Sequence, residues 1–145
     1  MSVEQNKALV RRRYDEIDNQ HNLAAMDELV AQDYVHHDPS VPRQMLQGRD
    51  GYQRLALMFN TAFPDGHTTI EEMIAEGDLV ATRFTTAGTH RGELMGVAAT
   101  GRRVEVTATS IYRIADGKLA EGWVNFDALG LLQQIGALPA PAPQD

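Results

Sequence analysis

The feature that most constrains this chain is the pair Asp116-Gly117, which separates two runs of β-branched and aromatic residues. A two-residue connection of this kind suits a type I′ turn, because both of its central residues need positive φ. Residues 102–126 are therefore predicted to form two long antiparallel strands joined by a tight hairpin. A short amphipathic segment closed by Gly136 follows and predicts a C-terminal helix. The rest of the chain must cover this hairpin.

Side chains alternate across a strand, so residue parity assigns the two faces of the hairpin. The even-numbered side chains form an apolar, partly small face against which helices could pack or a cavity could open: Val104, Val106, Ala108, Ser110, Tyr112, Ile114, Ala120, Gly122, Val124 and Phe126. The odd-numbered face mixes charged residues and threonines with Ile111, Leu119 and Trp123. No predicted helix remains to cover that face. We therefore expect a homodimer packed sheet to sheet, although ordinary surfaces also carry scattered apolar groups.

Composition limits the class of protein. At 145 residues the chain is long enough for one domain with a substantial core, predicted as residues 1–136, followed by a Pro/Ala-rich tail at 137–145 that should be extended or disordered. The net charge is −7 and the longest basic run is residues 11–13, which argues against nucleic acid and anionic membranes as main partners. These three arginines are interpreted as the solvent-exposed face of a helix.

Cysteine and leader signals also bear on location and chemistry. The sequence has no cysteine, which excludes a thiol nucleophile and a thiolate metal site and fits a cytoplasmic protein. The N-terminus lacks an apolar segment of signal-peptide type, and no apolar run of about 18 residues occurs. A soluble, untargeted chain is expected.

Helical patterns fill the first half of the chain. Ser2 and Gln5 form a capping-box pattern that opens a helix predicted to run to about Asn19. Asn22 is expected to cap a short second helix that ends near Gln32. Residues 33–39 then read as a short extended piece stopped by a proline, because the residue before proline is pushed towards extended geometry.

A third helix is predicted from Arg49, with an apolar i, i+3, i+4, i+7 stripe, until Pro64 ends it. Strands are expected near residues 67–76 and 79–89. Helices followed by antiparallel strands are typical of an α+β fold. We therefore expect a cone-shaped, curved antiparallel sheet wrapped around about three N-terminal helices, with a conical space in which a ligand could bind.

Three residues are candidates for proton transfer. His36 and His37 are adjacent, so only one of them can face the interior of an extended segment; we expect this to be His37, whose neighbour Asp38 could fix its tautomer and raise its basicity. His90 lies at a strand end beside a glycine-bearing loop. Asp127 either caps the last helix or acts as an acid or base. The alternatives are a surface histidine beside a satisfied one at positions 36 and 37, and a solvated loop histidine at position 90.

The remaining candidates concern ligand contact and metal binding. Aromatic residues are expected in the core and become ligand contacts if the cone is not filled. With the polar or aliphatic residues of the even strand face, the predicted ligand-binding set is Tyr14, Phe59, Phe63, Ser110, Tyr112, Trp123 and Val124. The histidine spacing suits no local metal site, so no metal is expected.

Several motifs stand together in one order along the chain. They are Phe63-Pro64-Asp65, Ala75-Glu76-Gly77-Asp78 with Val80-Ala81-Thr82-Arg83, Gly88-Thr89-His90-Arg91-Gly92-Glu93, Thr100-Gly101-Arg102-Arg103-Val104, Tyr112-Arg113, Asp116-Gly117-Lys118, Trp123, and Asp127-Ala128-Leu129-Gly130-Leu131-Leu132-Gln133-Gln134-Ile135-Gly136. In this order they resemble the SnoaL-like polyketide cyclase family of the nuclear transport factor 2-like superfamily. The resemblance spans about Val3 to Gly136.

This resemblance implies a cone-shaped, cystatin-like α+β barrel, a homodimer formed through the outer sheet face, an apolar pocket and no metal or organic cofactor. Cyclases of the family close a polyketide ring by an aldol step, with a pocket Asp as general acid/base and a nearby His. The comparison places these two groups at Val124 and Gly122 of this chain. Aliphatic positions cannot transfer a proton, and loss of a positioned acid/base group typically costs about 10²–10⁴ in rate.

Two functions follow as expectations. One is a cofactor-free enzyme, a cyclase, isomerase or hydrolase, that acts on a small carbonyl-bearing apolar ligand through His37, His90 or Asp127. The other is a non-catalytic, dimeric domain that binds a small molecule. A buried carboxylate or histidine with a shifted pKa in the cone would favour the enzyme, and a wholly apolar pocket would favour the binding domain.

Overall fold

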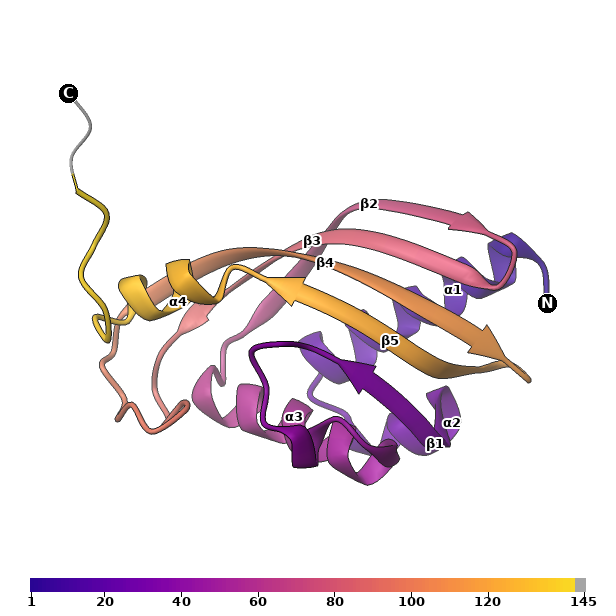
Figure 1. Cartoon of the computed structure of the whole chain (residues 1–145), viewed down its shortest axis with the longest axis horizontal. Helices are drawn as coiled ribbons and strands as arrows, with labels where there is room; N and C mark the ends of the chain where they lie inside the picture. Colours follow the sequence, from indigo (N-terminus) through magenta and orange to yellow (C-terminus); the bar gives the residue numbers. More distant parts are fainter. Residues whose placement is uncertain (143–145) are drawn as a thin grey trace.

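In the computed structural model, which describes residues 1–142, helices cover the concave side of a curved five-stranded sheet (Figure 1). The helical elements, in chain order, are α1 (Val3–Arg12), a π-helical continuation (Arg13–Asn19), a 3₁₀ turn (Leu23–Ala25), α2 (Met26–Leu29), a 3₁₀ turn (Arg43–Met45), α3 (Gly48–Ala62) and α4 (Ala128–Gln134). The strands are β1 (Val30–His37), β2 (His67–Glu76), β3 (Leu79–Thr89), β4 (Arg103–Ala115) and β5 (Lys118–Phe126). The predicted α+β fold is confirmed.

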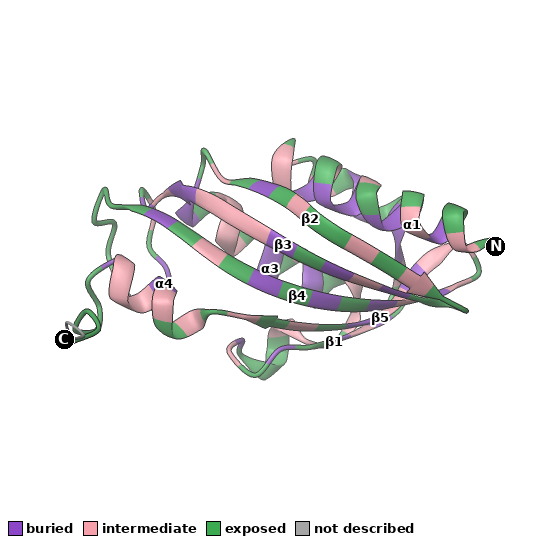
Figure 2. Ribbon diagram, turned by 90° about the horizontal axis from the view of Figure 1, so that it is seen from above, coloured by how far each residue is buried: buried purple, intermediate pink, exposed green. Residues whose placement is uncertain are grey.

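The predicted hairpin joins β4 and β5. Asp116 and Gly117 have φ values of 52° and 74°, the two positive values that a type I′ turn needs. Burial alternates along the strands (Figure 2), and the even-numbered side chains of β4 face the interior. The register between β4 and β5 shifts near the turn. Arg113 pairs with Glu121 but Ile114 pairs with Leu119, so the pairing skips Ala120 of β5.

This irregularity corrects one prediction. Leu119 was expected on the outer face, but it is fully buried in the core. A bulge adds one residue to a strand and reverses parity beyond it. The odd-numbered Trp123 lies on the far side of the bulge from the turn and is exposed on the outer face, as residue parity predicts. The odd-numbered Leu119 lies between the bulge and the turn, so it points to the core instead.

The strand order is β1-β5-β4-β3-β2, and β1 pairs with β5 in parallel. The expectation of a wholly antiparallel sheet is therefore wrong: the sheet is mixed. Parallel neighbours need a long crossover connection, here supplied by α3 and three strands between β1 and β5. Hairpin signals act only between neighbours along the chain and could not reveal this pairing. The predicted bounds of β2 and β3 are confirmed.

The capping box at the start of α1 is confirmed: the Ser2 hydroxyl accepts from the Gln5 amide at 3.1 Å, and the Ser2 amide donates to the Gln5 side chain at 2.8 Å. The helical path reaches Asn19 as expected. Asn22, in contrast, makes no side-chain capping bond, and α2 ends at Leu29 rather than near Gln32. The chain passes into β1 at once because its next residues pair with β5.

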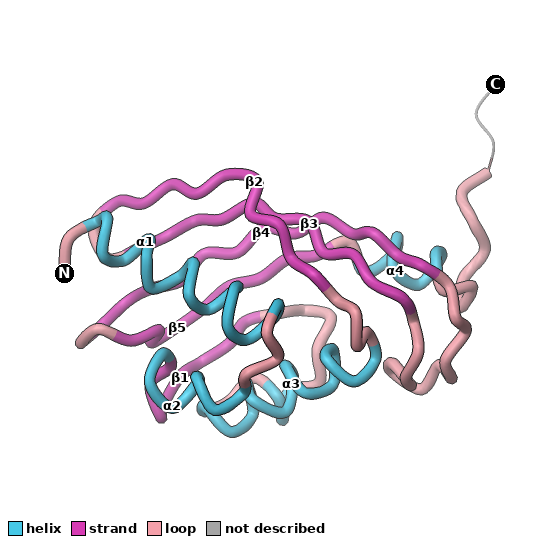
Figure 3. The backbone as a smooth tube through the Cα atoms, turned by 180° about the vertical axis from the view of Figure 1, so that it is seen from behind, coloured by secondary structure: helices cyan, strands magenta, loops and turns pink. Residues whose placement is uncertain are grey.

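Seen from behind, α1 and α3 lie on the same side of the sheet (Figure 3). α1 contacts β2 and β3, and α3 contacts β1, so the two helices cover opposite margins of the concave face. After α4, residues 137–142 form neither helix nor strand and lead away from the sheet. Residues 143–145 of the predicted tail lie outside the described residues. No helix within 1–142 has the length and apolar character needed to cross a membrane.

Candidate active site in the cone

A cavity of about 160 Å³ lies between the helices and the concave face of the sheet. Most of its wall is aromatic or aliphatic and includes Tyr14, Leu55, Phe59, Phe63, Phe84 and Tyr112. An engineered apolar cavity of about 150 Å³ accepts benzene. The cone therefore has room for one ring, or for one end of a larger ligand.

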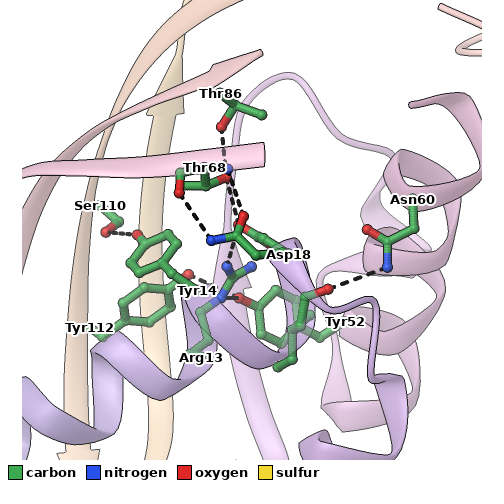
Figure 4. Close-up of polar contacts among 11 residues, drawn as sticks. Arg13, Tyr14, Asp18, Tyr52, Asn60, Thr68, Thr86, Ser110 and Tyr112 are labelled. Carbon is green, nitrogen blue, oxygen red and sulfur yellow. Dashed lines mark hydrogen bonds and ion pairs between the residues drawn. The ribbon is translucent and has the colours of Figure 1, made fainter. Parts of the chain in front are cut away.

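The wall contains a buried guanidinium, that of Arg13, which is only 8% exposed and lies on the π-helical continuation of α1 (Figure 4). Its Nε donates to the Tyr52 hydroxyl at 2.7 Å, and this hydroxyl lies 2.9 Å from that of Tyr112. Nη1 lies 2.8 Å from Oδ2 of Asp18, an ion pair without hydrogen-bond alignment. The guanidinium carbon is 4.8 Å from the centre of the Tyr14 ring. Arg13 is therefore held by one carboxylate and three tyrosines.

Burial by itself opposes the charge of Arg13, but the Asp18 carboxylate and the surrounding tyrosine oxygens outweigh it, so the pKa of Arg13 lies above its ordinary value. Burial raises the pKa of Tyr14, of Tyr34 and of Tyr112, which are therefore neutral phenols at physiological pH. The cavity thus holds a permanent cation among neutral hydroxyls.

His36 enters the cavity wall from β1 and is almost fully buried. Its ring stacks on Tyr52 with centres 4.9 Å apart, and its Nδ1 lies 2.8 Å from the Tyr34 hydroxyl. Burial, followed by the charge of Arg13, lowers the pKa of His36 to about 3. The ring is therefore neutral at pH 7. The 2.8 Å contact fits the tautomer in which the Tyr34 hydroxyl donates to Nδ1 and the proton of His36 is on Nε2.

Asp38 follows directly after β1 and also lines the cavity. It is 6% exposed, and its Oδ1 accepts from the Ser40 amide at 2.9 Å. Burial raises the pKa of Asp38, against the opposing effect of the Ser40 bonds. A buried carboxyl with a raised pKa is suited to giving and taking a proton.

His36 and Asp38 lie near Gly122 and Val124, the two positions of β5 at which this chain lacks an acid/base side chain. His36 pairs with Gly122, and His37 with Trp123. Asp38 comes directly after the last paired residue of β1, and both Asp38 and Val124 line the cavity. Gly122 cannot carry a side chain, because a Cβ there would collide with the Tyr34 hydroxyl and lie 2.7 Å from the Tyr112 ring. A histidine on the neighbouring strand and an aspartate at the end of that strand thus lie in the cavity wall with Gly122 and Val124 close by on β5.

His37 lies outside the cone. Its ring stacks on Trp123 at 5.2 Å, and its Nε2 is 2.8 Å from Glu121, with 45% of the side chain exposed. The predicted inward orientation of His37 is wrong, because the inward phase of β1 follows Val30, Tyr34 and His36. Trp123 was also expected to contact ligand, and it too lies on the outer face. Neither residue lines the cavity.

The other predicted residues divide into two groups. Tyr14, Phe59, Phe63, Tyr112 and Val124 line the cavity, and Ser110 positions one of them through a 2.6 Å hydrogen bond to the Tyr14 hydroxyl. His90 does not line the cavity; it is fully buried behind the lining residue Phe63 and shares a 2.9 Å hydrogen bond with Thr100. Asp127 caps α4 by accepting from the Gly130 amide at 2.8 Å, as the helix-cap alternative predicted.

Sequence reasoning missed Arg13, Asp18 and Tyr52 in the polar half of the cavity, chose His37 in place of His36, and gave Asp38 only a supporting role. The signal for Arg13 was available, because Val10, Arg13, Tyr14 and Ile17 follow the i, i+3, i+4, i+7 pattern of a buried stripe. The interpretation of residues 11–13 as a solvent-exposed face is therefore wrong for Arg13. Within residues 1–142, no three His, Asp or Glu side chains gather as a group that could hold a metal ion.

A cone of this kind, with helices on the concave face of a mixed sheet around a mostly apolar cavity, has the nuclear transport factor 2-like fold. A family model described as SnoaL-like polyketide cyclase matches residues 8–135. The chain therefore belongs to the SnoaL-like polyketide cyclase family.

Relatives agree with this assignment. Aklanonic acid methyl ester cyclase DnrD of Streptomyces peucetius is 28% identical over 134 residues, which are 92% of this chain and 92% of that protein. The crystal structure of AclR from Streptomyces galilaeus has a TM-score of 0.85 at 30% identity and covers 97% of this chain and 87% of AclR. IdmH from Streptomyces antibioticus has a TM-score of 0.78 at 34% identity, with 91% of this chain and 99% of IdmH covered.

Proposed function

We propose that this protein is a cofactor-free enzyme of the cyclase type that moves a proton at the carbon next to a carbonyl in a small apolar ligand. Asp38 is its acid/base and neutral His36 its hydrogen-bond donor. The observation that carries the proposal is their common position in the cavity wall, with His36 on β1 beside Gly122 and Asp38 directly after the end of that strand. The acid/base pair implied for β5 thus has its counterpart at the end of the adjacent strand.

The chemistry needs no external reagent. The Asp38 carboxylate takes a proton from the α-carbon, and the C–H electrons form an enolate. The Nε2–H of His36 donates to the enolate oxygen, which a neutral imidazole can do without releasing its own proton. The α-carbon then attacks a second carbonyl of the same ligand, and the resulting alkoxide takes the proton from Asp38. Product and substrate are isomers, and Asp38 is regenerated.

The relatives support this class of ligand. Two of the matched proteins are named aklanonic acid methyl ester cyclases, and this name describes ring closure on a methyl ester. For this chain we propose the broader class, an apolar molecule with at least two carbonyl groups. The cavity volume restricts what lies fully inside the cone to about one ring.

Hydrogen–deuterium exchange tests the proposal. β-Tetralone is an apolar ketone with acidic α-hydrogens, and its exchange in D₂O can be followed by proton NMR with and without protein. Wild-type protein should accelerate exchange, and Asp38→Asn should lower the protein-dependent rate by about 10²–10⁴. Asp127→Ala is the matched control: it should lose about 1 kcal/mol of stability with its helix cap and keep its exchange rate.

Acceleration that survives in Asp38→Asn at the wild-type level would reject Asp38 as the acid/base. If Asp127→Ala lost the rate instead while remaining stable, the catalytic carboxylate would be the one on the last strand-to-helix junction.

A non-catalytic binding domain is the second candidate. It is favoured by Gly122 and Val124, which leave β5 without a proton-transfer group, and by the largely apolar lining. This candidate predicts that β-tetralone binds without any faster exchange, so the same measurement separates the two functions.

We also propose a homodimer formed through the outer sheet face. Ile111 and Trp123 are directly opposite each other on β4 and β5 and are 40% and 36% exposed. A cross-strand apolar pair on a face that no helix of residues 1–142 covers is suited to burial against a second copy.

A further inference from the structure

Arg13 has donor capacity that the proposed proton transfer does not use. Only its Nε makes an aligned hydrogen bond within the described residues, to Tyr52. Nη1 is fully buried without an aligned acceptor, and Nη2 makes no hydrogen bond to residues 1–142. Guanidinium groups donate to oxygen acceptors in the plane of the group. Because Nη1 is enclosed beside Asp18, Nη2 is the nitrogen left to donate to a molecule in the cavity.

The charge around Arg13 is only partly compensated. Its one close carboxylate, Asp18, also accepts from the Thr68 hydroxyl at 3.2 Å and has a side chain 25% exposed (Figure 4). A partly solvated partner of this kind screens a buried cation less completely than a fully buried one. In a cavity of low polarity, an anionic oxygen near the guanidinium would be strongly favoured.

The aromatic residues fix the position of this cation. The guanidinium carbon lies 4.8, 5.5 and 5.9 Å from the ring centres of Tyr14, Tyr52 and Tyr112. Cation–π contacts with three rings and the hydrogen bond to Tyr52 restrict its movement. A preorganised cation beside an apolar slot selects a flat ligand with its charge at one edge.

We infer that Arg13 forms an anion subsite in the cone and that the ligand is an aromatic or enolic ring with one ionised oxygen, bound edge-on to the guanidinium. The inference rests on the proposed function and narrows its substrate to an acidic enol or phenol. His36 and Arg13 both contact Tyr52, so the neutral donor and the cation belong to one wall of the cavity. Two oxygens of one ligand can then be bound together.

The test uses para-nitrophenol, which titrates near neutral pH and whose phenolate has its own visible absorption band. The uncharged control probe is para-nitrotoluene, in which a methyl group replaces the hydroxyl. Wild-type protein should bind the phenolate about tenfold more tightly than para-nitrotoluene and should lower the apparent pKa of the bound phenol by about one unit. Absorption titration gives the second quantity, and calorimetry gives both affinities.

The variant to compare is Arg13→Met combined with Asp18→Asn, because removal of Arg13 alone would leave a carboxylate without its partner. This double variant should bind para-nitrotoluene at least as well as wild type and lose the preference for phenolate. Arg13→Lys keeps the charge and should retain part of that preference. Asp38→Asn should keep or strengthen it, so the anion subsite and the acid/base proposal can fail separately.

Equal affinity of wild-type protein for the two probes overturns the inference, as does absence of phenolate binding. A phenolate preference that persists in the double variant also overturns it. If the double variant does not fold, Arg13→Lys and the wild-type titration still decide: an unshifted pKa for the bound phenol rejects the subsite.

Discussion

Replacement of His36 by glutamine should change how the stability of the protein depends on pH. The folded ring titrates at about 3, whereas a histidine in the unfolded chain titrates at its ordinary value of 6.5. Between these values the unfolded chain binds one proton that the folded protein does not. Stability is therefore greatest above pH 6.5 and is lost as the pH falls towards 3.

The magnitude follows from the width of this window. Each pH unit costs about 1.4 kcal/mol when one proton distinguishes the two states. From pH 6.5 to pH 5, a fall of about 1.5 units, wild-type protein should lose about 2 kcal/mol of unfolding free energy through His36. His36→Gln has no proton to bind and should lack this loss, although it forfeits the stacking on Tyr52 at every pH.

The assay is urea denaturation of both proteins at several pH values, with the difference in unfolding free energy plotted against pH. His37→Gln is the matched control, because it removes the adjacent histidine, which lies on the exposed side of β1 outside the cone. Other titrating groups are common to the compared proteins and cancel. Parallel pH profiles for wild type and His36→Gln would refute the burial of a neutral His36 in the cone.

Two further predictions concern β5 and the outer face. Gly122→Ala should cost about 1–3 kcal/mol in thermal or urea denaturation, because its methyl group would collide with the Tyr34 hydroxyl and press on the Tyr112 ring; a neutral effect would contradict the close packing there. The double variant Ile111→Thr, Trp123→Gln should sediment as a monomer at roughly tens of micromolar where wild type sediments as a dimer, while Leu57→Thr, an exposed apolar residue on α3, should leave the dimer intact; a monomeric wild type would end the dimer proposal.

Local signals predicted the elements of this fold well. Asp116-Gly117 defined the hairpin, Ser2 and Gln5 opened α1, and the apolar stripe before Pro64 defined α3. Each of these signals acts within a few residues, where turn geometry, capping and helical periodicity decide the structure. The resemblance to a family supplied the cone, which local patterns alone could only suggest.

The site was harder to predict because it depends on pairing between distant segments. His36 and His37 differ only in phase, and this phase is set by where β1 begins and by its parallel register with β5. Leu119 was misplaced because a bulge beside the turn reverses parity. Arg13 was interpreted as one of three surface arginines although it lies on the apolar stripe of its helix, and the packing of Tyr52 and Tyr112 around it shows how its charge is accommodated.

The central claim is that Asp38 is the proton-transfer group of the cone, and its own titration tests this most directly. Protein labelled with ¹³C at aspartate carboxyl carbons can be titrated by NMR, and the Asp38 signal assigned by its absence in Asp38→Asn. Because burial stabilises the neutral carboxylic acid, the titration midpoint should lie clearly above the ordinary 3.8. A midpoint at or below that value would mean a solvated or ion-paired carboxylate and would contradict the role assigned to Asp38.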